Sequence, residues 1–248
     1  MKSNLIKNIR LYLSDKLLSG HKIFLGKSDS HYLKNVMRIR SGEELLVFNG
    51  KEGEWTARVD EITKEGISIS ILLQVRKQEY YPKIHCYCAP LKFNRYNYTI
   101  EKLTELGVSD ITPIITEFTD VRTVNTIRIQ ARIKEAAEQC GLLQLPKIHN
   151  EISLSRLLAN WKEEHIIIFA DEIAENINPY VALKNLREDS ISIFIGPEGG
   201  FSDKERQRIL ASNKVLRISL GPRILRADTA AIAAISLIQS AWGDWYSS

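Results

Sequence analysis

The first third of the chain alternates apolar and polar residues in short segments. KIFLG, ELLVFNG, EWTARVDEI and GISISILLQV, between residues 22 and 75, have this period of two, and glycines punctuate them. Alternation over such lengths is typical of β-strands. Residues 30–39 instead place Leu33, Val36 and Met37 on one helical face, after Ser30 as a candidate cap. The pattern predicts a compact β-barrel over residues 1–72 with one inserted helix, in the size range of small barrels that bind RNA.

The pattern changes after residues 76–79, a plausible linker. Apolar strand-length runs now alternate with helical periods, so residues 73–248 are predicted to form an α/β domain with a mostly parallel sheet covered on both faces. The expected strands are 83–91, 110–117, 165–172, 190–200 and 214–221. The expected helices are 95–107, 126–141, 179–188, 203–212 and 228–242.

Composition narrows the class of protein further. No apolar run near the N-terminus resembles a signal peptide, and the charge-free stretch from Thr229 to Gly243 is too short to span a bilayer, so we expect a cytoplasmic protein without membrane contact. Three cysteines do not make a disulfide framework. Cys86 and Cys88 project from one face of an expected strand and have no clustered partners for a metal, which favours reduced core thiols.

The net charge of +4 is unevenly distributed. Residues 1–72 hold 12 Lys and Arg against 9 Asp and Glu, an excess of three, and the remainder holds 22 against 21. This asymmetry suggests a weakly basic N-terminal module that faces a polyanion. Solvated basic faces of this size are common, so charge by itself does not establish RNA binding.

Two loops carry the candidate chemistry. The first, IGPEGGFSDKE, follows an apolar strand and opens a helix, at the sheet edge where open α/β proteins bind ligands. Gly199 and Gly200 permit a tight turn and close approach of a ligand to main-chain N–H groups. Ser202 and Glu205 form a capping box that fixes the start of the helix. Alone, the segment fits an ordinary turn with a solvated Glu198 equally well.

The second loop, LGPRILRADTA, places Ile224 and Leu225 between two arginines. Loops are usually polar unless something covers them, and a flat apolar ligand such as adenine would cover these two residues. The alternative is that they plug the core of the domain itself and that Arg226 pairs with Asp228.

Several common nucleotide-site motifs are absent from the sequence. No two glycines are spaced i and i+2, which argues against a Rossmann dinucleotide site or the usual glycine-rich methyltransferase loop. The sequence also has no P-loop, no H-E-x-x-H and no nucleophile elbow. The five histidines are scattered singly.

Together the two loops resemble the signatures of the RsmE family of the SPOUT superfamily, methyltransferases that modify N3 of a uridine in 16S ribosomal RNA. IEKLTELGVSDITPI (100–114), EAAEQCG (135–141) and HYLKNVMRIRSGEEL (31–45) are similar to further family segments in order and spacing. The resemblance covers nearly the whole chain. It departs at Leu142, where the family usually has arginine, which puts one RNA contact in doubt. It also departs at residues 226–229, RADT, where RTET is common.

The resemblance implies an N-terminal PUA-like RNA-binding barrel, a C-terminal SPOUT domain with a deep trefoil knot, and a homodimer. It implies S-adenosylmethionine as the cofactor and 16S rRNA of the small ribosomal subunit as the partner, with no metal. The cofactor would be held in the knot by three loops. On this chain the cofactor-binding residues are expected to be Phe169, Ala170, Asp171, Gly196, Pro197, Gly199, Gly200, Leu220, Gly221, Ile224, Leu225 and Arg226.

Methylation of uridine N3 requires removal of the proton that N3 carries. A cation beside the developing uracil anion, or a base, would assist that removal. Arg226 is the electrostatic candidate, and Glu198 is a candidate base or RNA-orienting group. Candidates for phosphate contacts, each of which also fits a solvated surface charge, are Arg10, Arg38, Arg40, Lys92, Arg95 and Lys102.

Two other classes of function remain open. A non-catalytic RNA-binding assembly factor would keep the barrel but would not need both loops intact, as they are here. A nucleotide-binding α/β enzyme unrelated to RNA would explain the loops but not the basic N-terminal module.

Overall fold

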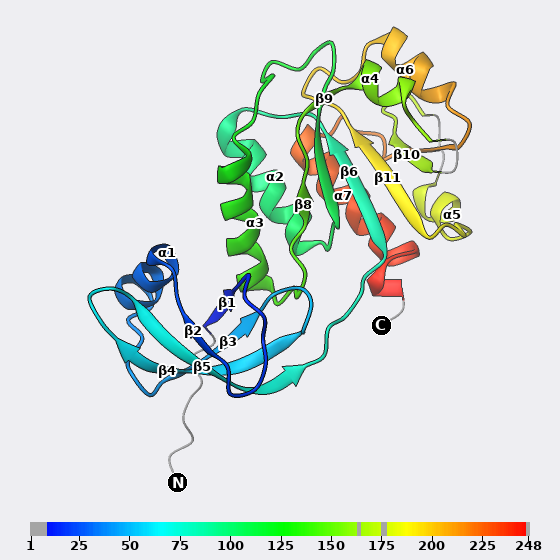
Figure 1. The fold of residues 1–248 in the computed structure, drawn as a ribbon. Coiled ribbons are helices and arrows are strands. Elements are labelled where there is room, and N and C mark those ends of the chain that lie inside the picture. The colour runs from blue at the N-terminus through cyan, green and yellow to red at the C-terminus, as the bar shows by residue number, and fades with distance from the viewer. Residues whose placement is uncertain (1–8, 163–164, 175–177, 247–248) are drawn as a thin grey trace. The chain divides into compact units, whose positions relative to one another are not determined.

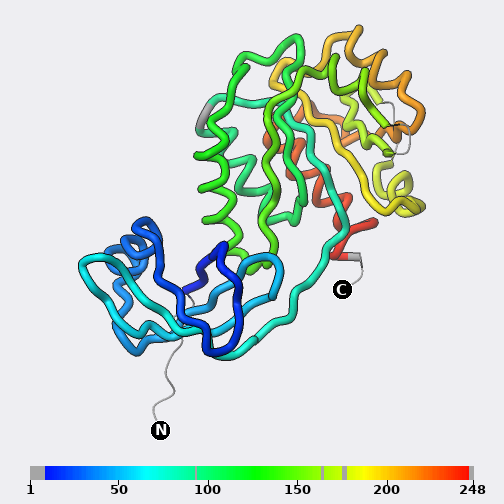
Figure 2. The backbone as a smooth tube through the Cα atoms, in the orientation of Figure 1, coloured from blue at the N-terminus to red at the C-terminus, as the bar shows by residue number. Residues whose placement is uncertain are grey.

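The computed structural model describes residues 9–162, 165–174 and 178–246, and the chain divides into two compact units (Figure 1). Unit 1 is Met1–Tyr80 with Ala137–Gln144, and unit 2 is Tyr81–Ala136 with Leu145–Ser248. The segment 137–144, green in Figure 2, therefore returns to the N-terminal unit. The outer ends of the two expected domains, 1–8 and 247–248, lie outside the described residues. The domain boundary at residue 72 stays a prediction.

Unit 1 contains a five-stranded sheet in the order β1-β3-β4-β5-β2. β1 joins β3 in parallel and the other pairs are antiparallel. Along β5, Ile67, Ile69 and Ile71 are fully buried while the serines between them point to the other face, because side chains alternate along a strand. The strands are β1 (Arg10–Tyr12), β2 (Lys22–Phe24), β3 (Glu44–Phe48), β4 (Glu54–Ile62) and β5 (Ile67–Arg76).

The inserted helix of unit 1 differs from the expected one. The sequence predicts a single helix over 30–39, but the structure has α1 (Lys27–His31) followed directly by a π-helix, η1 (Tyr32–Val36). The apolar face of this segment holds its position, since Leu33 is fully buried. Arg38 follows with φ of +52°, and among the described residues it is the only non-glycine with positive φ. π-turns of this kind occur frequently at functional sites.

Unit 2 is built on a parallel sheet in the order β12-β10-β11-β6-β7-β8, with β9 paired to β7. Every strand pair in it is parallel, as the alternation of strands and helices predicts. The two-residue strands β8 and β9 are too short to show a period in the sequence. The strands are β6 (Lys83–Cys88), β7 (Asp110–Ile115), β8 (Lys147–Ile148), β9 (Ile152–Ser153), β10 (Ile166–Ala170), β11 (Ser190–Ile195) and β12 (Val215–Ile218).

Helices cover both faces of this sheet (Figure 1). In β10, Ile166 and Ile168 join the core on one face, while Ile167 and Phe169 join the core on the other. α2 (Phe93–Glu105), α3 (Thr126–Cys140), α5 (Pro179–Leu183) and α7 (Ala227–Ala241) cover the first face, and α7 runs on to a 3-10 turn, η2 (Asp244–Tyr246). α4 (Leu154–Ala159) and α6 (Asp203–Leu210) pack on the second. The residues that β10 directs to either face of the sheet are therefore apolar, as expected for a sheet buried on both sides.

The chain turns back across the sheet after its last strand. β12 lies at the edge of the sheet and pairs with β10. The next element, α7, contacts β11, which lies one strand further into the sheet than β10, and also contacts α2. The connection between β12 and α7, residues 219–226, therefore passes over the end of β10. This crossed connectivity is compatible with the knotted class that the family resemblance implies, and it brings the second candidate loop beside the first.

Candidate active site

Three strand ends form the candidate site. β12, β10 and β11 are neighbours and run in parallel, so their carboxyl ends meet at one edge of the sheet, where open α/β proteins bind ligands. A cavity of about 700 Å³ opens there. Its walls come from the segments after β10 (169–174), β11 (195–201) and β12 (219–225), with further residues from the starts of α5 and α7.

Most of the predicted cofactor residues line this cavity. They are Phe169, Ala170, Asp171, Gly196, Pro197, Gly200, Leu220, Gly221, Ile224 and Leu225. Two are not part of its wall: Gly199, on the outside of its turn, and Arg226, whose neighbours Leu225 and Ala227 do line it. The two loops that the sequence marks separately, and the third that the family resemblance adds after β10, thus share one cavity.

The GPEGG loop is a tight turn that leads into a fixed helix start. The amide of Gly200 donates to the carbonyl of Pro197 at 3.0 Å, and Gly200 has φ of +70°, which favours glycine. The predicted capping box is present, because Ser202 accepts from the Glu205 amide and the Glu205 carboxylate accepts from the Ser202 amide. The turn and the capping box therefore fix where the cavity wall ends and α6 begins.

The loop after β12 is apolar and open. Gly221 has φ of +103° and turns the chain, and Ile224 is 91% exposed although it lines the cavity. Ile224 therefore does not plug the core. Asp228 pairs with Arg95, at 3.6 Å, and not with Arg226. The structure thus argues against the alternative at Ile224 and at Asp228, while Leu225 is half-buried, and the side chain of Ile224 is available to a ligand.

Asp171 holds the three cavity loops together. Its carboxylate, 3% exposed, follows β10 and accepts from Arg206 on α6, at 3.1 and 2.9 Å, and from Arg217 on β12, at 2.8 Å. The Ile173 amide donates to it at 3.1 Å. Burial by itself would raise the pKa of Asp171, but the hydrogen bonds from Arg206, Ile173 and Arg217 outweigh burial and hold that pKa below its usual range.

Of the two candidate catalytic residues, Glu198 lines the cavity and Arg226 lies between two residues that line it, Leu225 and Ala227. Glu198 is exposed. Arg226 is the N-cap residue of α7 and is also exposed. Within the described part of the chain its guanidinium makes no hydrogen bond or ion pair, in contrast to Arg206 and Arg217. A free guanidinium beside an apolar cavity can receive a developing anion.

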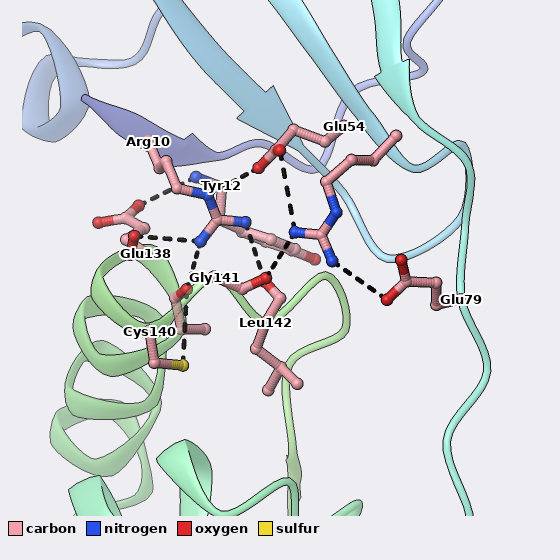
Figure 3. A network of polar contacts seen from close by, with 10 residues as sticks. Arg10, Tyr12, Glu54, Glu79, Glu138, Cys140, Gly141 and Leu142 are labelled. Carbon is pink, nitrogen blue, oxygen red and sulfur yellow. Dashed lines mark hydrogen bonds and ion pairs between the residues drawn. The ribbon is translucent and has the colours of Figure 1, made fainter. Parts of the chain in front are cut away.

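Arg10, a predicted phosphate ligand, has an internal role instead (Figure 3). Its Nε pairs with the buried Glu54 at 2.6 Å, and its Nη atoms donate to the carbonyls of Ala137, Glu138 and Leu142 at the end of α3. Arg76 adds a bond to the Gly141 carbonyl at 3.0 Å. Two arginines thus satisfy carbonyls that a helix C-terminus leaves open. Arg10 is therefore not part of the proposed RNA surface.

The other phosphate candidates fall into two groups. Lys102 is bound by Glu101 and Glu105, whose hydrogen bonds raise the pKa of Lys102, and Arg95 pairs with Asp228. Both are therefore engaged within unit 2. The remaining candidates, Arg38, Arg40 and Lys92, are exposed and keep their side chains available.

Sequence reasoning missed several cavity residues. Asn178 and Pro179 at the start of α5 show a local signal, since an Asn cap followed by Pro marks a helix start, and Asn178 does accept from the Tyr180 amide. Nothing local places that helix at the cavity. Other unpredicted lining residues are Glu172, Ile173, Ala174, Ile195, Phe201, Arg206, Ser219, Pro222, Arg223, Ala227 and Ala230.

Metal clusters and membrane spans are both absent from the described residues. No group of three or more His, Cys, Asp and Glu side chains is placed to hold a metal ion there. No helix in that part of the chain is long and apolar enough to cross a membrane. Cys86 and Cys88 are free, buried thiols of the core, as expected from their strand positions.

Known proteins match the chain over nearly its full length. Residues 78–239 match the model of the RNA methyltransferase domain, and residues 25–72 match the RNA methyltransferase PUA domain. A ribosomal RNA small subunit methyltransferase E from Rickettsia conorii is 32% identical over 94% of this chain and 96% of its own length.

Solved structures agree with these sequence matches. A putative methyltransferase from Legionella pneumophila, in complex with the cofactor SAM, has a TM-score of 0.85 and 32% identity, over 96% of this chain and 100% of that one. A ribosomal RNA small subunit methyltransferase E from Neisseria gonorrhoeae, bound to S-adenosyl methionine, has a TM-score of 0.85 and 30% identity, over 96% and 99%.

Fold, cavity and relatives together define an RNA methyltransferase of the α/β SPOUT class with an N-terminal PUA-like module, and this expectation from the sequence is confirmed. Within that class, the chain belongs to the ribosomal RNA small subunit methyltransferase E family. The resemblance to the RsmE family is thereby confirmed.

Proposed function

We propose that this protein transfers the methyl group of S-adenosylmethionine to N3 of a uridine in 16S ribosomal RNA. The observation that carries the proposal is the single cavity into which all three loops open, with an exposed apolar wall at Ile224. Membership of the family supports ribosomal RNA as the substrate, and the SAM-bound relatives support S-adenosylmethionine as the cofactor.

The cavity fits the cofactor in size and chemistry. Its volume of about 700 Å³ lies within the usual range of small-molecule sites. Leu220, Ile224 and Leu225 offer apolar surface to the adenine, and the glycine turn of Gly196 and Gly200 offers main-chain groups at close approach. Phe169 and Ala170 form the wall at the end of β10. Asp171 shapes this wall through Arg206 and Arg217.

When bound, the cofactor supplies an electrophilic methyl group on a sulfonium. The N3 lone pair of uracil forms the new bond to carbon, the sulfur–carbon bond breaks to leave a neutral thioether, and the N3 proton passes to solvent or a base. The pKa of uridine N3 lies about two units above pH 7. Removing that proton at pH 7 therefore costs about 3 kcal/mol, at ~1.36 kcal/mol per pKa unit.

Residues on and next to the cavity wall would lower this cost. Arg226 is the proposed electrostatic catalyst: its exposed guanidinium, which has no ion pair among the described residues, would stabilise the uracil carbonyls as charge develops. Glu198, exposed on the cavity wall, is the proposed base or orienting group for the RNA.

Residues 1–72 are the proposed RNA-binding module, and residues 73–248 the methyltransferase domain. Arg38 and Arg40, two exposed cations of residues 1–72, are the proposed phosphate contacts of the RNA-binding module. The positive φ of Arg38, two residues after the π-helix, supports a functional role, because backbone strain tends to be kept where function needs it. Lys92 is the proposed phosphate contact in unit 2.

We further propose that the protein is a homodimer and that it acts in the cytoplasm, where its ribosomal substrate is assembled. Large apolar side chains near the cavity support self-association, because Ile173, Tyr180, Val181 and Ile224 are all exposed. Exposed apolar residues that gather into one patch commonly mark protein contacts.

The test uses small ribosomal subunits from cells that lack this protein. Incubation with the protein and S-adenosylmethionine, followed by mass mapping of the 16S RNA, should reveal one new methyl group on uridine N3. Calorimetric titration of the cofactor, with and without RNA, separates the other classes. RNA binding without cofactor binding would indicate an assembly factor, and cofactor binding without any methylated RNA would indicate an unrelated nucleotide enzyme.

A further inference from the structure

The loop that follows β7 packs against the outside of the GPEGG turn. A Cβ on Gly199 would lie 3.1 Å from the Cβ of Phe118 and 3.5 Å from its Cγ, so the aromatic side chain rests directly on this glycine. Glu198 and Gly200, on either side, line the cofactor cavity, whereas Gly199 does not. Gly199 therefore has a structural reason to lack a side chain that is separate from the cofactor: it seats Phe118.

The same loop is fixed by polar contacts. The amide of Glu117 donates to the Glu205 carboxylate at 2.9 Å, and Glu205 is also the capping-box residue of α6. The amide of Thr116 donates to the Thr119 hydroxyl at 3.0 Å, and both threonines are 3% exposed. The backbone around Phe118 is thus fixed by the buried Thr116 and Thr119 and by the hydrogen bond from the Glu117 amide to Glu205.

In spite of these constraints the Phe118 side chain is 47% exposed. A side chain held only to fill the core would be buried, and burial of an aromatic side chain is strongly favourable. A rigid aromatic side chain left open beside a cofactor cavity is instead the arrangement with which proteins stack the bases of unpaired RNA. Arg122, four residues further along the same loop, is an exposed cation for the RNA backbone.

We propose that Phe118 is a stacking platform for an unpaired base of the RNA substrate, on the outer side of the turn whose Glu198 and Gly200 line the cofactor cavity. The inference rests on the proposed function and adds a substrate-positioning residue to it. The stacked base is either the target uracil or its neighbour in the RNA, since the chemistry of stacking is the same for both. Gly199 and Glu205 keep the platform in place.

The experiment measures steady-state methylation of unmethylated small ribosomal subunits by full-length variants, together with calorimetric affinity for S-adenosylmethionine. Phe118→Ala should lower kcat/KM for the subunit by about tenfold or more, as loss of one base stack does, and leave cofactor affinity within about twofold. Phe118→Tyr and Phe118→Trp should retain most activity, whereas Phe118→Leu should resemble the alanine variant. Loss in kcat identifies the target uracil as the stacked base, and loss confined to KM identifies a flanking base.

Two controls make the result specific. Ile127→Ala removes another apolar side chain, 79% exposed at the start of α3, and should leave kcat/KM unchanged. Gly199→Ala pushes a methyl group against Phe118 and should reduce kcat/KM. Combined with Phe118→Ala it should cause no further loss, because both changes act on one contact.

Full activity of Phe118→Ala or of Phe118→Leu, or a fall in cofactor affinity that parallels activity, would overturn the inference. Failure of the proposed function would look different, since the wild-type protein itself would then leave the 16S RNA unmethylated.

Discussion

Replacing Asp171 by asparagine tests how the cofactor cavity is held open. The substitution keeps the shape of the side chain but removes the charge that Arg206 and Arg217 share. Removing one partner from a buried ion pair costs about 3–5 kcal/mol. The two arginine side chains are 21% and 33% exposed and can regain water, so we expect the lower end of that range, about 3 kcal/mol.

For a protein of this size that loss corresponds to a fall in melting temperature of about 6–12 °C, at 2–4 °C per kcal/mol. Affinity for S-adenosylmethionine should fall about tenfold or more, because the ends of β10 and β12 and the start of α6 would no longer be held in one arrangement and binding would have to order them. Differential scanning calorimetry and titration calorimetry on the same samples measure both quantities.

The pH dependence gives an independent check. The folded state lowers the pKa of Asp171, so its stabilisation is present above the unfolded pKa, about 4, and is lost as pH falls through the lower folded value. Asp171→Asn should lack this acid-dependent loss. Asp189→Asn makes the same substitution at an exposed acid outside the cavity wall, and this control should change neither quantity. An unchanged melting temperature with lost cofactor affinity would refute the reasoning and make Asp171 a direct cofactor ligand.

Three other side chains offer tests of their own. Arg226→Ala should lower single-turnover rates by about a hundredfold with little change in cofactor affinity, and Arg226→Lys should recover only part, because a point charge does not replace the planar guanidinium; a parallel loss of affinity would contradict the catalytic role. Burial lowers the pKa of His85 from 6.5 to about 4, so the unfolded state takes up the proton first and stability should fall by up to about 3 kcal/mol between pH 6.5 and 4. Urea unfolding at several pH values should show this slope for the wild type and a flatter one for His85→Gln. Glu54→Ala leaves Arg10, 10% exposed, without its counter-charge and should destabilise the protein by about 3 kcal/mol or more by urea unfolding, whereas an unchanged midpoint would show that the carbonyls of α3 suffice.

Local patterns in the sequence predicted much of the secondary structure. The alternation in EWTARVDEI marks β4 over the residues it occupies, 54–62, and Ser202 with Glu205 fixes the start of α6. Such signals work because they report short-range preferences of the backbone. β1, with three residues, carries no period of its own and forms because it pairs with β3, more than thirty residues away. The π-turn after α1 likewise has no period that the sequence displays.

The candidate site divides in the same way. The glycines of the GPEGG turn and the apolar residues in the loop after β12 are local anomalies, and the amino-acid sequence alone marks them as candidates for a binding site, with an ordinary turn and a core plug as the alternatives. The contacts of Asp171 with Arg206 and Arg217, and of Gly199 with Phe118, join residues at least 35 positions apart. They exist because β12 lies beside β10 and because the loop after β7 reaches the turn after β11.

The sequence by itself therefore determined where the chain bends and which loops are chemically unusual. Only the tertiary structure decided which charges are already neutralised. Arg10 and Arg226 look alike in the sequence, but Arg10 is enclosed by Glu54 and the carbonyls of α3, while Arg226 is exposed at the start of α7. The physical reason is that the free energy of a charge depends on its burial and on its partners, and both are set by residues far away along the chain.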